Sequence, residues 1–389
     1  MLKLVSRSIG AVRNIFRQNN KYSVGLEAID SPRGASPLEA IDSPPETSAQ
    51  PYSEARALVA KLGASMGPFG ITPSLFSVNL GVAPCNHSCL FCPQSVHKPK
   101  KARWLALDVL RKVLGEMPEE GIQIGLSSYS ETITAPNLVP VVRLMKEIRP
   151  GLPIAMATNG TIFREQIISD LMDAGLDHLS FSFDAATPED YAKMMQVDHF
   201  QQAWDSLEKI VDMRTRKQSP ITITTHIMAF EGREADYEKF KEYWEKKLDF
   251  VQWRRVANWG GENWGLEQQM AEAGFVSAHK TPDVRYPCFS IFHHFKLNWD
   301  GYYYPCVAAV PDYEKEHQRH CVPDLGHASE VTWRQAWQNL KDMQQAHLEG
   351  RWDAYEACKS CNVWSMYDDV WDKTKIADGS THFSIPGIL

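Results

Sequence analysis

From Ser74 onward, short apolar stretches alternate with longer segments in which apolar residues recur at helical spacing. The strand-like stretches are "SLFSVNLGV", "GIQIGLSS", "LPIAMATNG", "LDHLSFSFD", "ITITTHIMAF" and "DFVQWRRVAN". Segments such as "LALDVLRKVLGEM" and "QQAWDSLEKIVDM" separate them and are typical of amphipathic helices. Six strands joined by helices predict an α/β fold with a parallel sheet or a partial barrel. Functional residues in such folds gather at the carboxyl ends of the strands.

The length of 389 residues is large for one compact domain and predicts three regions. These are a tail over residues 1–50, an α/β core over 51–265 and a smaller domain, rich in cysteine and aromatic residues, over 266–389. A net charge of -7 does not favour nucleic-acid binding. No run of about 18 apolar residues predicts a membrane span. Because no signal peptide is recognised, we expect a cytoplasmic protein with reduced cysteines.

The tail begins with "MLKLVSRSIGAVRNIFRQNNK", which carries five basic residues, and the first acidic residue is Glu27. Val5, Ile9, Val12 and Phe16 would share one face of a helix. We interpret this segment as a frayed basic tail, with a membrane-surface or targeting helix as the alternative. The motif "LEAIDSP" then occurs twice in a Pro- and Ser-rich stretch, which predicts a flexible linker.

Three cysteines, Cys85, Cys89 and Cys92, lie within "CNHSCLFC", directly after the first predicted strand. Three thiolates can hold three irons of a [4Fe–4S] cluster and leave the fourth iron open for another ligand. A zinc site with His87 or His97 as the fourth ligand is the alternative. Neither histidine produces the paired CxxC spacing that is common in zinc knuckles, so we favour the cluster.

The spacing of these cysteines, with the aromatic Phe91 before the third, resembles the signature of the radical S-adenosylmethionine (radical SAM) superfamily. The resemblance implies a partial (β/α)6 barrel and a [4Fe–4S] cluster whose open iron binds the amino and carboxylate groups of S-adenosylmethionine. It further implies that reductive cleavage of this cofactor releases a 5′-deoxyadenosyl radical. An electron donor such as flavodoxin or ferredoxin would supply the electron.

Polar residues at the following strand ends appear in the order that the resemblance implies for cofactor binding. They are Glu131 in "YSET", Thr158 and Asn159 in "TNG", and Ser182 and Asp184 in "SFSFD". By resemblance, Glu131 takes the methionine amino group, and Ser182 and Asp184 lie near the ribose and the carboxylate. The family has a Gly-Gly-Glu-Pro-like turn around this Glu, and here both glycines and the proline are absent. The alternative is that these residues only cap strand ends.

Four more cysteines, Cys288, Cys306, Cys358 and Cys361, can close a second cluster that has no open iron. Together with "GYYYPC" and "CKSC", they resemble the SPASM/twitch extension of radical SAM enzymes. A full SPASM domain usually carries seven cysteines, so the resemblance implies the twitch form with one auxiliary [4Fe–4S] cluster. A four-cysteine zinc knuckle is the alternative.

A closed cluster cannot bind substrate directly, but it can accept an electron. We therefore expect an oxidoreductase that oxidises a hydroxyl-bearing carbon of a sugar or cyclitol, as the resemblance to twitch enzymes implies. The remaining Cys321 is a buried apolar side chain, a replacement cluster ligand, or the hydrogen donor of a sugar epimerase. A peptide (RiPP) maturase ranks second, because the tail is too short for a leader-binding domain. A non-catalytic iron–sulfur scaffold is the third hypothesis.

The last predicted strand runs into "VQWRRVANWGGENWG", near the expected substrate position. Its candidate contacts are Trp253, Trp259 and Trp264 for stacking and Arg254, Arg255 and Asn258 for hydroxyl or phosphate groups. Strand alternation directs only one arginine of the pair inward. We select Arg255 and His226 as catalytic candidates beside Cys321. His226 can accept the hydroxyl proton, with His293 and His294 as alternatives.

Overall fold

The computed structural model describes residues 72–96, 98–261, 266–306, 322–375 and 381–384. All of them belong to one compact unit of the chain, Val59–Leu389. The predicted basic tail with its "LEAIDSP" repeat lies outside the described residues, as do His97, Trp264 and Cys321. None of the helices in the described segments has the length and apolar character needed to cross a membrane.

The described residues form a nine-stranded sheet with the order β7-β6-β5-β4-β3-β1-β8-β9, and β2 pairs with β1. Its strands are β1 (Leu75–Val82), β2 (Arg103–Trp104), β3 (Gln123–Tyr129), β4 (Ile154–Thr158), β5 (His178–Asp184), β6 (Thr222–Met228), β7 (Phe250–Arg254), β8 (His294–Leu297) and β9 (Tyr303–Tyr304). The pairs from β1 through β7 along this order are all parallel, which confirms the predicted α/β fold. The carboxyl ends of these strands therefore meet at one edge.

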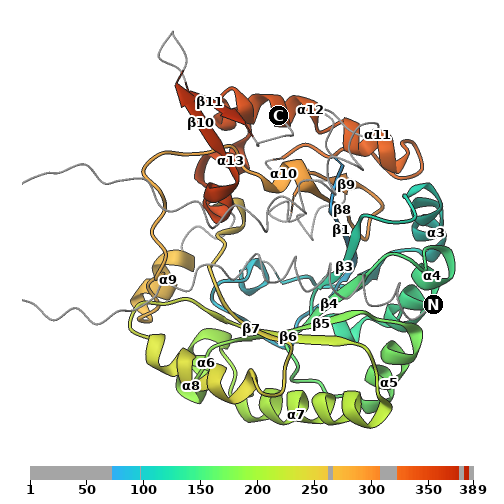
Figure 1. The fold of residues 1–389 in the computed structure, drawn as a ribbon, viewed down its shortest axis with the longest axis vertical. Helices are drawn as coiled ribbons and strands as arrows, with labels where there is room; N and C mark the ends of the chain where they lie inside the picture. The colour runs from blue at the N-terminus through green and yellow to red at the C-terminus, as the bar shows by residue number, and fades with distance from the viewer. Residues whose placement is uncertain (1–71, 97, 262–265, 307–321, 376–380, 385–389) are drawn as a thin grey trace, which may run out of the picture. The chain divides into compact units, whose positions relative to one another are not determined.

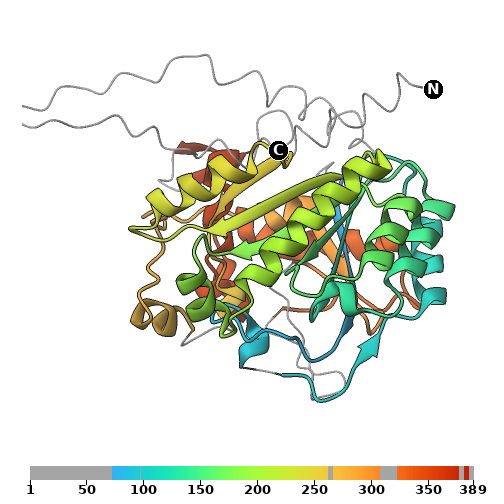
Figure 2. The same cartoon turned by 90° about the horizontal axis from the view of Figure 1, so that it is seen from below.

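Helices connect the strands and pack along the outer side of the curved sheet (Figures 1 and 2). They are α3 (Leu107–Glu116), α4 (Leu138–Ile148), α5 (Glu165–Ala174), α6 (Pro188–Met195), α7 (Phe200–Lys217), α8 (Glu234–Trp244) and α9 (Leu266–Glu272). Local sequence explains their ends. Thr187 caps α6 by accepting a hydrogen bond from Asp190 N at 3.2 Å. Gly175 ends α5 in the left-handed conformation, with φ of 91°.

The region after residue 265 adds short elements. They are α10 (Ser290–His293), α11 (Trp333–Gln338), α12 (Lys341–Leu348), α13 (Glu356–Ser360), β10 (Asp372–Lys375) and β11 (Thr381–Ser384). The 3₁₀ helices among the described residues are η3 (Pro93–Ser95), η4 (Thr132–Thr134), η5 (Trp259–Gly261), η6 (Trp352–Ala354) and η7 (Val363–Val370). The sequence predicts one helix across "TWRQAWQNLKDMQQAHLEG", whereas the structure divides it into α11 and α12. The division lies at Asn339, whose side chain donates to Leu325 O at 3.0 Å.

Strand β8 belongs to the predicted second domain but pairs in parallel with β1, next to the last strand of the sheet order. Its His294 contributes Nε2 to a hydrogen bond with Ser77 Oγ on β1 at 2.8 Å. Strand β9 then pairs with β8 in antiparallel fashion. One sheet therefore contains strands from both sides of residue 265. The predicted domain boundary at this residue stays a proposal.

Candidate functional site

The three-cysteine loop lies between β1 and β2 and is held at the carboxyl edge of the sheet by backbone hydrogen bonds. Ala83 N donates to Tyr129 O at the end of β3 at 3.2 Å. Leu90 N donates to Met194 O in α6 at 2.9 Å. The side-chain amide of Gln94 also donates to the Tyr129 carbonyl. The loop is therefore fixed between β3 and α6 on two sides.

The thiols of Cys85, Cys89 and Cys92 lie close enough together for each to act electrostatically on another. Burial is the main cause that raises the pKa of each thiol, to about 12 for Cys92. Buried thiolates are therefore unfavourable here unless a cation compensates their charge. Iron would supply that charge, so the donor set fits the predicted cluster.

Glu131 follows β3, and its carboxylate is 4% exposed. It accepts hydrogen bonds from Ile133 N at 3.1 Å, Thr158 Oγ1 at 2.5 Å and Asn159 N at 2.7 Å. Burial raises the pKa of Glu131, and these three hydrogen bonds oppose that shift. The predicted cofactor residues Thr158 and Asn159 thus hold the Glu131 carboxylate in one orientation. Direct cofactor contacts of Glu131, Thr158 and Asn159 stay predictions.

An amide and hydroxyl network joins the cysteine loop to the end of β4. Asn159 Nδ2 donates to Asn86 Oδ1 at 2.9 Å, and Asn86 Nδ2 donates to Thr161 Oγ1 at 2.8 Å. Asn86 Oδ1 lies 3.7 Å from the sulfur of Cys85. Asn86 and Thr161 are not among the site residues predicted from the sequence. Their position inside or just after a selected motif is the signal that could have identified them.

Asp184 and His226 lie side by side on β5 and β6. The register shifts between Ser182 and Asp184, and Asp184 has a positive φ of 64°. This bulge turns the buried carboxylate toward His226, whose Nε2 lies 2.9 Å from Asp184 Oδ1. Arg254 Nη1 lies 3.5 Å from the same His226 nitrogen. Burial and the Arg254 charge lower the pKa of His226, so its imidazole is neutral at neutral pH.

The two neighbouring arginines point to different partners, as strand alternation predicts. Arg255 donates to the carbonyl of Ser365 in η7, and Arg254 Nη2 donates to Gln252 Oε1 at 2.9 Å. The Arg254 side chain is exposed, yet the surrounding protein desolvates it and lowers the pKa of its guanidinium. Arg255 is the arginine predicted from the sequence to be catalytic, and the structure adds Arg254 beside His226.

The two described tryptophans that were predicted to contact substrate, Trp253 and Trp259, lie in different surroundings. Trp253 packs against Tyr237 of α8, with ring centroids 4.3 Å apart, and so contributes to the packing of α8 on the sheet. This position corrects the expectation that Trp253 stacks on substrate. Trp259 Nε1 instead donates to the carbonyl of Phe91 in the cysteine loop at 3.0 Å. His294 is buried and His293 is half-buried, and desolvation lowers the pKa of His293 to about 4.

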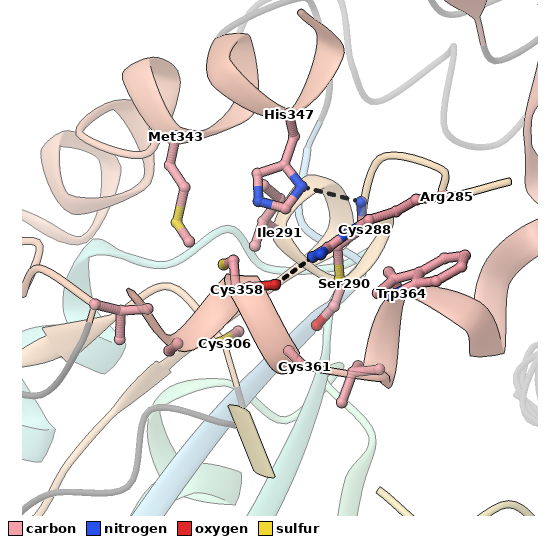
Figure 3. Close-up of a pocket in the computed structure, with 13 residues that line it drawn as sticks. Arg285, Cys288, Ser290, Ile291, Cys306, Met343, His347, Cys358, Cys361 and Trp364 are labelled. Atoms are coloured by element: carbon pink, nitrogen blue, oxygen red, sulfur yellow. Dashed lines mark hydrogen bonds between the residues drawn. The ribbon is translucent and has the colours of Figure 1, made fainter. Parts of the chain in front are cut away.

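The second set of cysteines lines a single pocket, shown in Figure 3. Its four thiols belong to Cys288, Cys306, Cys358 and Cys361. Burial raises the pKa of Cys361 to about 11, and burial together with the other three thiols raises the pKa of Cys288 well above its ordinary value. Within the described residues, no three His, Cys, Asp or Glu side chains are placed to hold a single metal ion. Four thiols around a pocket match the ligand set of a [4Fe–4S] cluster.

The segment after β7 contacts both cysteine regions. Asn258 and Asn362 form reciprocal bonds, from Asn258 N to Asn362 Oδ1 at 2.9 Å and from Asn362 N to Asn258 Oδ1 at 3.0 Å. Asn362 directly follows Cys361, and the neighbouring Trp259 binds the loop that contains Phe91. This segment therefore couples the two sets of cysteines mechanically.

Two family models match the chain in this order. The radical SAM superfamily model matches residues 83–243, and the model of SPASM, an iron–sulfur cluster-binding domain, matches residues 288–362. A GTP 3',8-cyclase of Desulforamulus reducens is 26% identical over 131 residues, which are 33% of this chain and 40% of the relative. An AdoMet-dependent heme synthase of Methanosarcina barkeri is 31% identical over 107 residues, 28% of this chain and 30% of the relative. The chain thus spans less than half the length of these relatives.

Among solved structures, SuiB of Streptococcus suis bound to S-adenosylmethionine superposes with a TM-score of 0.53 at 12% sequence identity. The superposition covers 82% of this chain and 78% of SuiB and shows a shared fold. The two matched domains imply a [4Fe–4S] cluster that binds S-adenosylmethionine and auxiliary iron–sulfur binding. The chain therefore contains a radical SAM domain over residues 83–243, followed by a SPASM iron–sulfur cluster-binding domain over residues 288–362.

Proposed function

We propose that this radical SAM enzyme oxidises a hydroxyl-bearing carbon of a sugar or cyclitol and passes one electron to an auxiliary cluster. The observation that carries the proposal is the pocket lined by four thiols beside the barrel. Cys85, Cys89 and Cys92 would hold the cluster with the open iron. Cys288, Cys306, Cys358 and Cys361 would hold a cluster with no open iron, which can only take up or release electrons.

When bound, S-adenosylmethionine and the two clusters supply a 5′-deoxyadenosyl radical and an electron acceptor. Oxidation of the substrate would remove one hydrogen atom from the carbon, one proton from the hydroxyl and one electron; the bound groups would take the hydrogen atom and the electron, and a side chain of the protein would take the proton. The carbon–oxygen single bond thereby becomes a ketone. The chain must therefore hold the cofactor, orient the hydroxyl and accept one proton.

For the cofactor, Glu131 is the proposed partner of the methionine amino group, because three hydrogen bonds fix its carboxylate. Asp184 and Ser182 are proposed near the ribose and the carboxylate, and Phe91 beside the cluster. The burial of Glu131 strengthens any hydrogen bond that its carboxylate accepts from an amino N–H, since little water competes for the charge.

For the proton, we propose His226 as the acceptor. Its Nε2 faces Asp184, and its Nδ1 has no hydrogen-bond partner among the described residues. The Asp184 carboxylate, 2.9 Å from Nε2, only accepts hydrogen bonds, so we assign the imidazole proton to Nε2 and a lone pair to Nδ1; in this tautomer the Arg254 guanidinium, 3.5 Å away, acts on Nε2 by its charge and not by a hydrogen bond. Because burial and Arg254 keep the imidazole neutral, this lone pair can take up a proton.

The space beside Arg254 is the proposed substrate position. Tyr367 of η7 lies close enough to Arg254 and to the thiols of Cys288 and Cys306 for their charges to act on its hydroxyl. A substrate bound at Arg254 would therefore lie near Tyr367, which is itself close to two thiols of the auxiliary pocket. Guanidinium groups bind several oxygens at fixed geometry, which suits a polyol or its phosphate.

The test uses the full chain, reconstituted anaerobically with iron and sulfide and reduced with dithionite or with flavodoxin or ferredoxin. Sugars, cyclitols and their phosphates are offered with S-adenosylmethionine, and ketone and 5′-deoxyadenosine are quantified. We expect equal amounts of both products. In Cys358→Ala, 5′-deoxyadenosine should still form, whereas ketone formation should fall at least tenfold.

Cys321→Ala separates oxidation from epimerisation. An oxidoreductase should retain most of its ketone formation in this variant. Inversion of a carbon with deuterium uptake from D2O, lost in Cys321→Ala, would contradict the proposal and establish the epimerase. A modified peptide in place of a ketone would establish the maturase.

A further inference from the structure

Two N–H groups that line the auxiliary pocket have no hydrogen-bond acceptor among the described residues. They are Nε2 of His347, on α12, and Nε of Arg285. Both atoms are shielded from solvent, and the His347 side chain is 1% exposed. Figure 3 shows both side chains among the four cysteines. A buried donor without an acceptor is costly, which points to an acceptor that binds in the pocket.

The tautomer of His347 follows from its one protein contact. Nδ1 lies 3.2 Å from the backbone N of Cys288, and that N–H can only donate. Nδ1 must therefore be the acceptor, and the ring proton resides on Nε2. The backbone contact fixes the ring beside the first cysteine of the pocket. The orientation of the Nε2–H bond is consequently fixed by the ring.

Arg285 is held by its other nitrogens. Nη1 donates to Lys359 O at 3.2 Å and Nη2 donates to the carbonyl of Cys358. The guanidinium lies over the rings of Trp352 and Trp364, 5.2 and 5.6 Å from their centroids. Its positive charge acts on the thiols of the pocket, including Cys358. Only Nε remains without a protein acceptor in the described part of the chain.

We propose that His347 Nε2–H and Arg285 Nε–H donate hydrogen bonds to sulfur atoms of the auxiliary cluster and raise its reduction potential. Reduction adds one negative charge to the cluster, and both donors stabilise that charge more than the oxidised form. No proton or covalent bond changes place in this step. This inference rests on the proposed function in one respect: a higher reduction potential is useful because it favours transfer of the substrate electron to the auxiliary cluster. The contacts themselves are independent of the substrate.

The potential is measured in the full chain with Cys85→Ala, Cys89→Ala and Cys92→Ala, so that only the auxiliary cluster contributes. An EPR-monitored redox titration without substrate or S-adenosylmethionine reports its midpoint. His347→Asn keeps an acceptor for Cys288 N but removes the Nε2 donor. We expect its one-electron reduction constant to fall about tenfold, a shift of about 59 mV to lower potential. His347→Gln, which can place an amide N–H near the Nε2 position, should shift the potential less.

A second measurement is the coupling between the reduced cluster and the proton on His347 Nε2. The reduced cluster should show an exchangeable proton coupling that disappears in D2O and is lost in His347→Asn. His178→Asn is the matched control, because His178 is equally buried and does not line the pocket. The reduction potential of the auxiliary cluster in His178→Asn should equal that in the protein that carries only the three cysteine replacements.

Unchanged potential and unchanged proton coupling in His347→Asn at full iron content would overturn the proposal for His347. If His347→Asn fails to bind iron, Arg285→Met decides, since it removes the second donor and its charge. It should lower the potential, and an unchanged value would overturn the proposal. Absence of an auxiliary iron–sulfur cluster in the background protein would instead refute the proposed function.

Discussion

At the residue scale, the site depends on a few buried polar groups whose partners come from neighbouring strand ends. Glu131 is the clearest case, because its two carboxylate oxygens receive three hydrogen bonds from the ends of β3 and β4. Such a carboxylate loses little freedom on binding a ligand, since its orientation is already set. The same preorganisation makes it sensitive to small chemical changes.

Glu131→Gln should weaken binding of S-adenosylmethionine at least tenfold, which is about 1.4 kcal/mol. The amide removes the negative charge and turns one N–H donor toward the donors of Thr158 or Asn159. The change is measured by titrating the cofactor into reconstituted protein and following the EPR spectrum of the first cluster. The control is Glu147→Gln, whose exposed ion pair with Arg111 lies on the surface, and its affinity should be that of the wild type. Equal affinity of Glu131→Gln and the control would contradict the assignment of Glu131.

At the element scale, short connections after β7 and α13 join the two halves of the site. Asn258 and Asn362 act like paired caps, because each side chain accepts from the backbone N–H of the other. Asn362 Nδ2 also donates to Val256 O at 3.1 Å, and Asn258 Nδ2 to Ser360 O at 2.6 Å. Such contacts replace regular secondary structure in a part of the chain that has little of it.

Asn362→Ala should destabilise the protein by about 1–3 kcal/mol, because it leaves the half-buried Asn258 N–H and Val256 carbonyl without these partners. The loosened turn should also reduce auxiliary iron content, since Asn362 adjoins Cys361. Denaturant unfolding and iron analysis measure the two effects. Thr332→Ala is the matched control, because it removes the capping box of α11 at a cost of about 1 kcal/mol. The control should retain full iron, and equal iron content in both variants would argue against the coupling.

At the scale of the whole molecule, one sheet supports both sets of cysteines. Cys85 follows β1, while Cys288 precedes α10 and β8, and Cys306 follows β9. Because β8 pairs with β1, the auxiliary pocket is anchored to the strand that carries the first cysteine loop. The two proposed clusters are thus held by the same framework.

The full chain should bind about eight irons when it is reconstituted without oxygen, and about four after replacement of Cys85, Cys89 and Cys92 by Ala. Elemental analysis and Mössbauer spectra give the counts and the cluster types. Replacement of Cys288, Cys306, Cys358 and Cys361 should leave the other four irons. Four irons and one zinc in the wild-type chain would support a zinc knuckle in place of the auxiliary cluster.

The sequence by itself determined the strands β1 and β3 to β7, the helices between them and the positions of the cysteine motifs. These features depend on local periodicity, turn residues and short spacings, which a linear sequence contains directly. Glu131, Thr158 and Asn159 could be selected for the same reason, since they follow predicted strands.

Only the tertiary structure decided which distant residues meet. It paired β8 with β1, divided the helix at Asn339 and directed Arg254 rather than Arg255 toward His226. It also brought His347 to within hydrogen-bonding distance of Cys288, 59 positions earlier in the chain. Contacts of this range depend on how whole elements pack, and no local period encodes them.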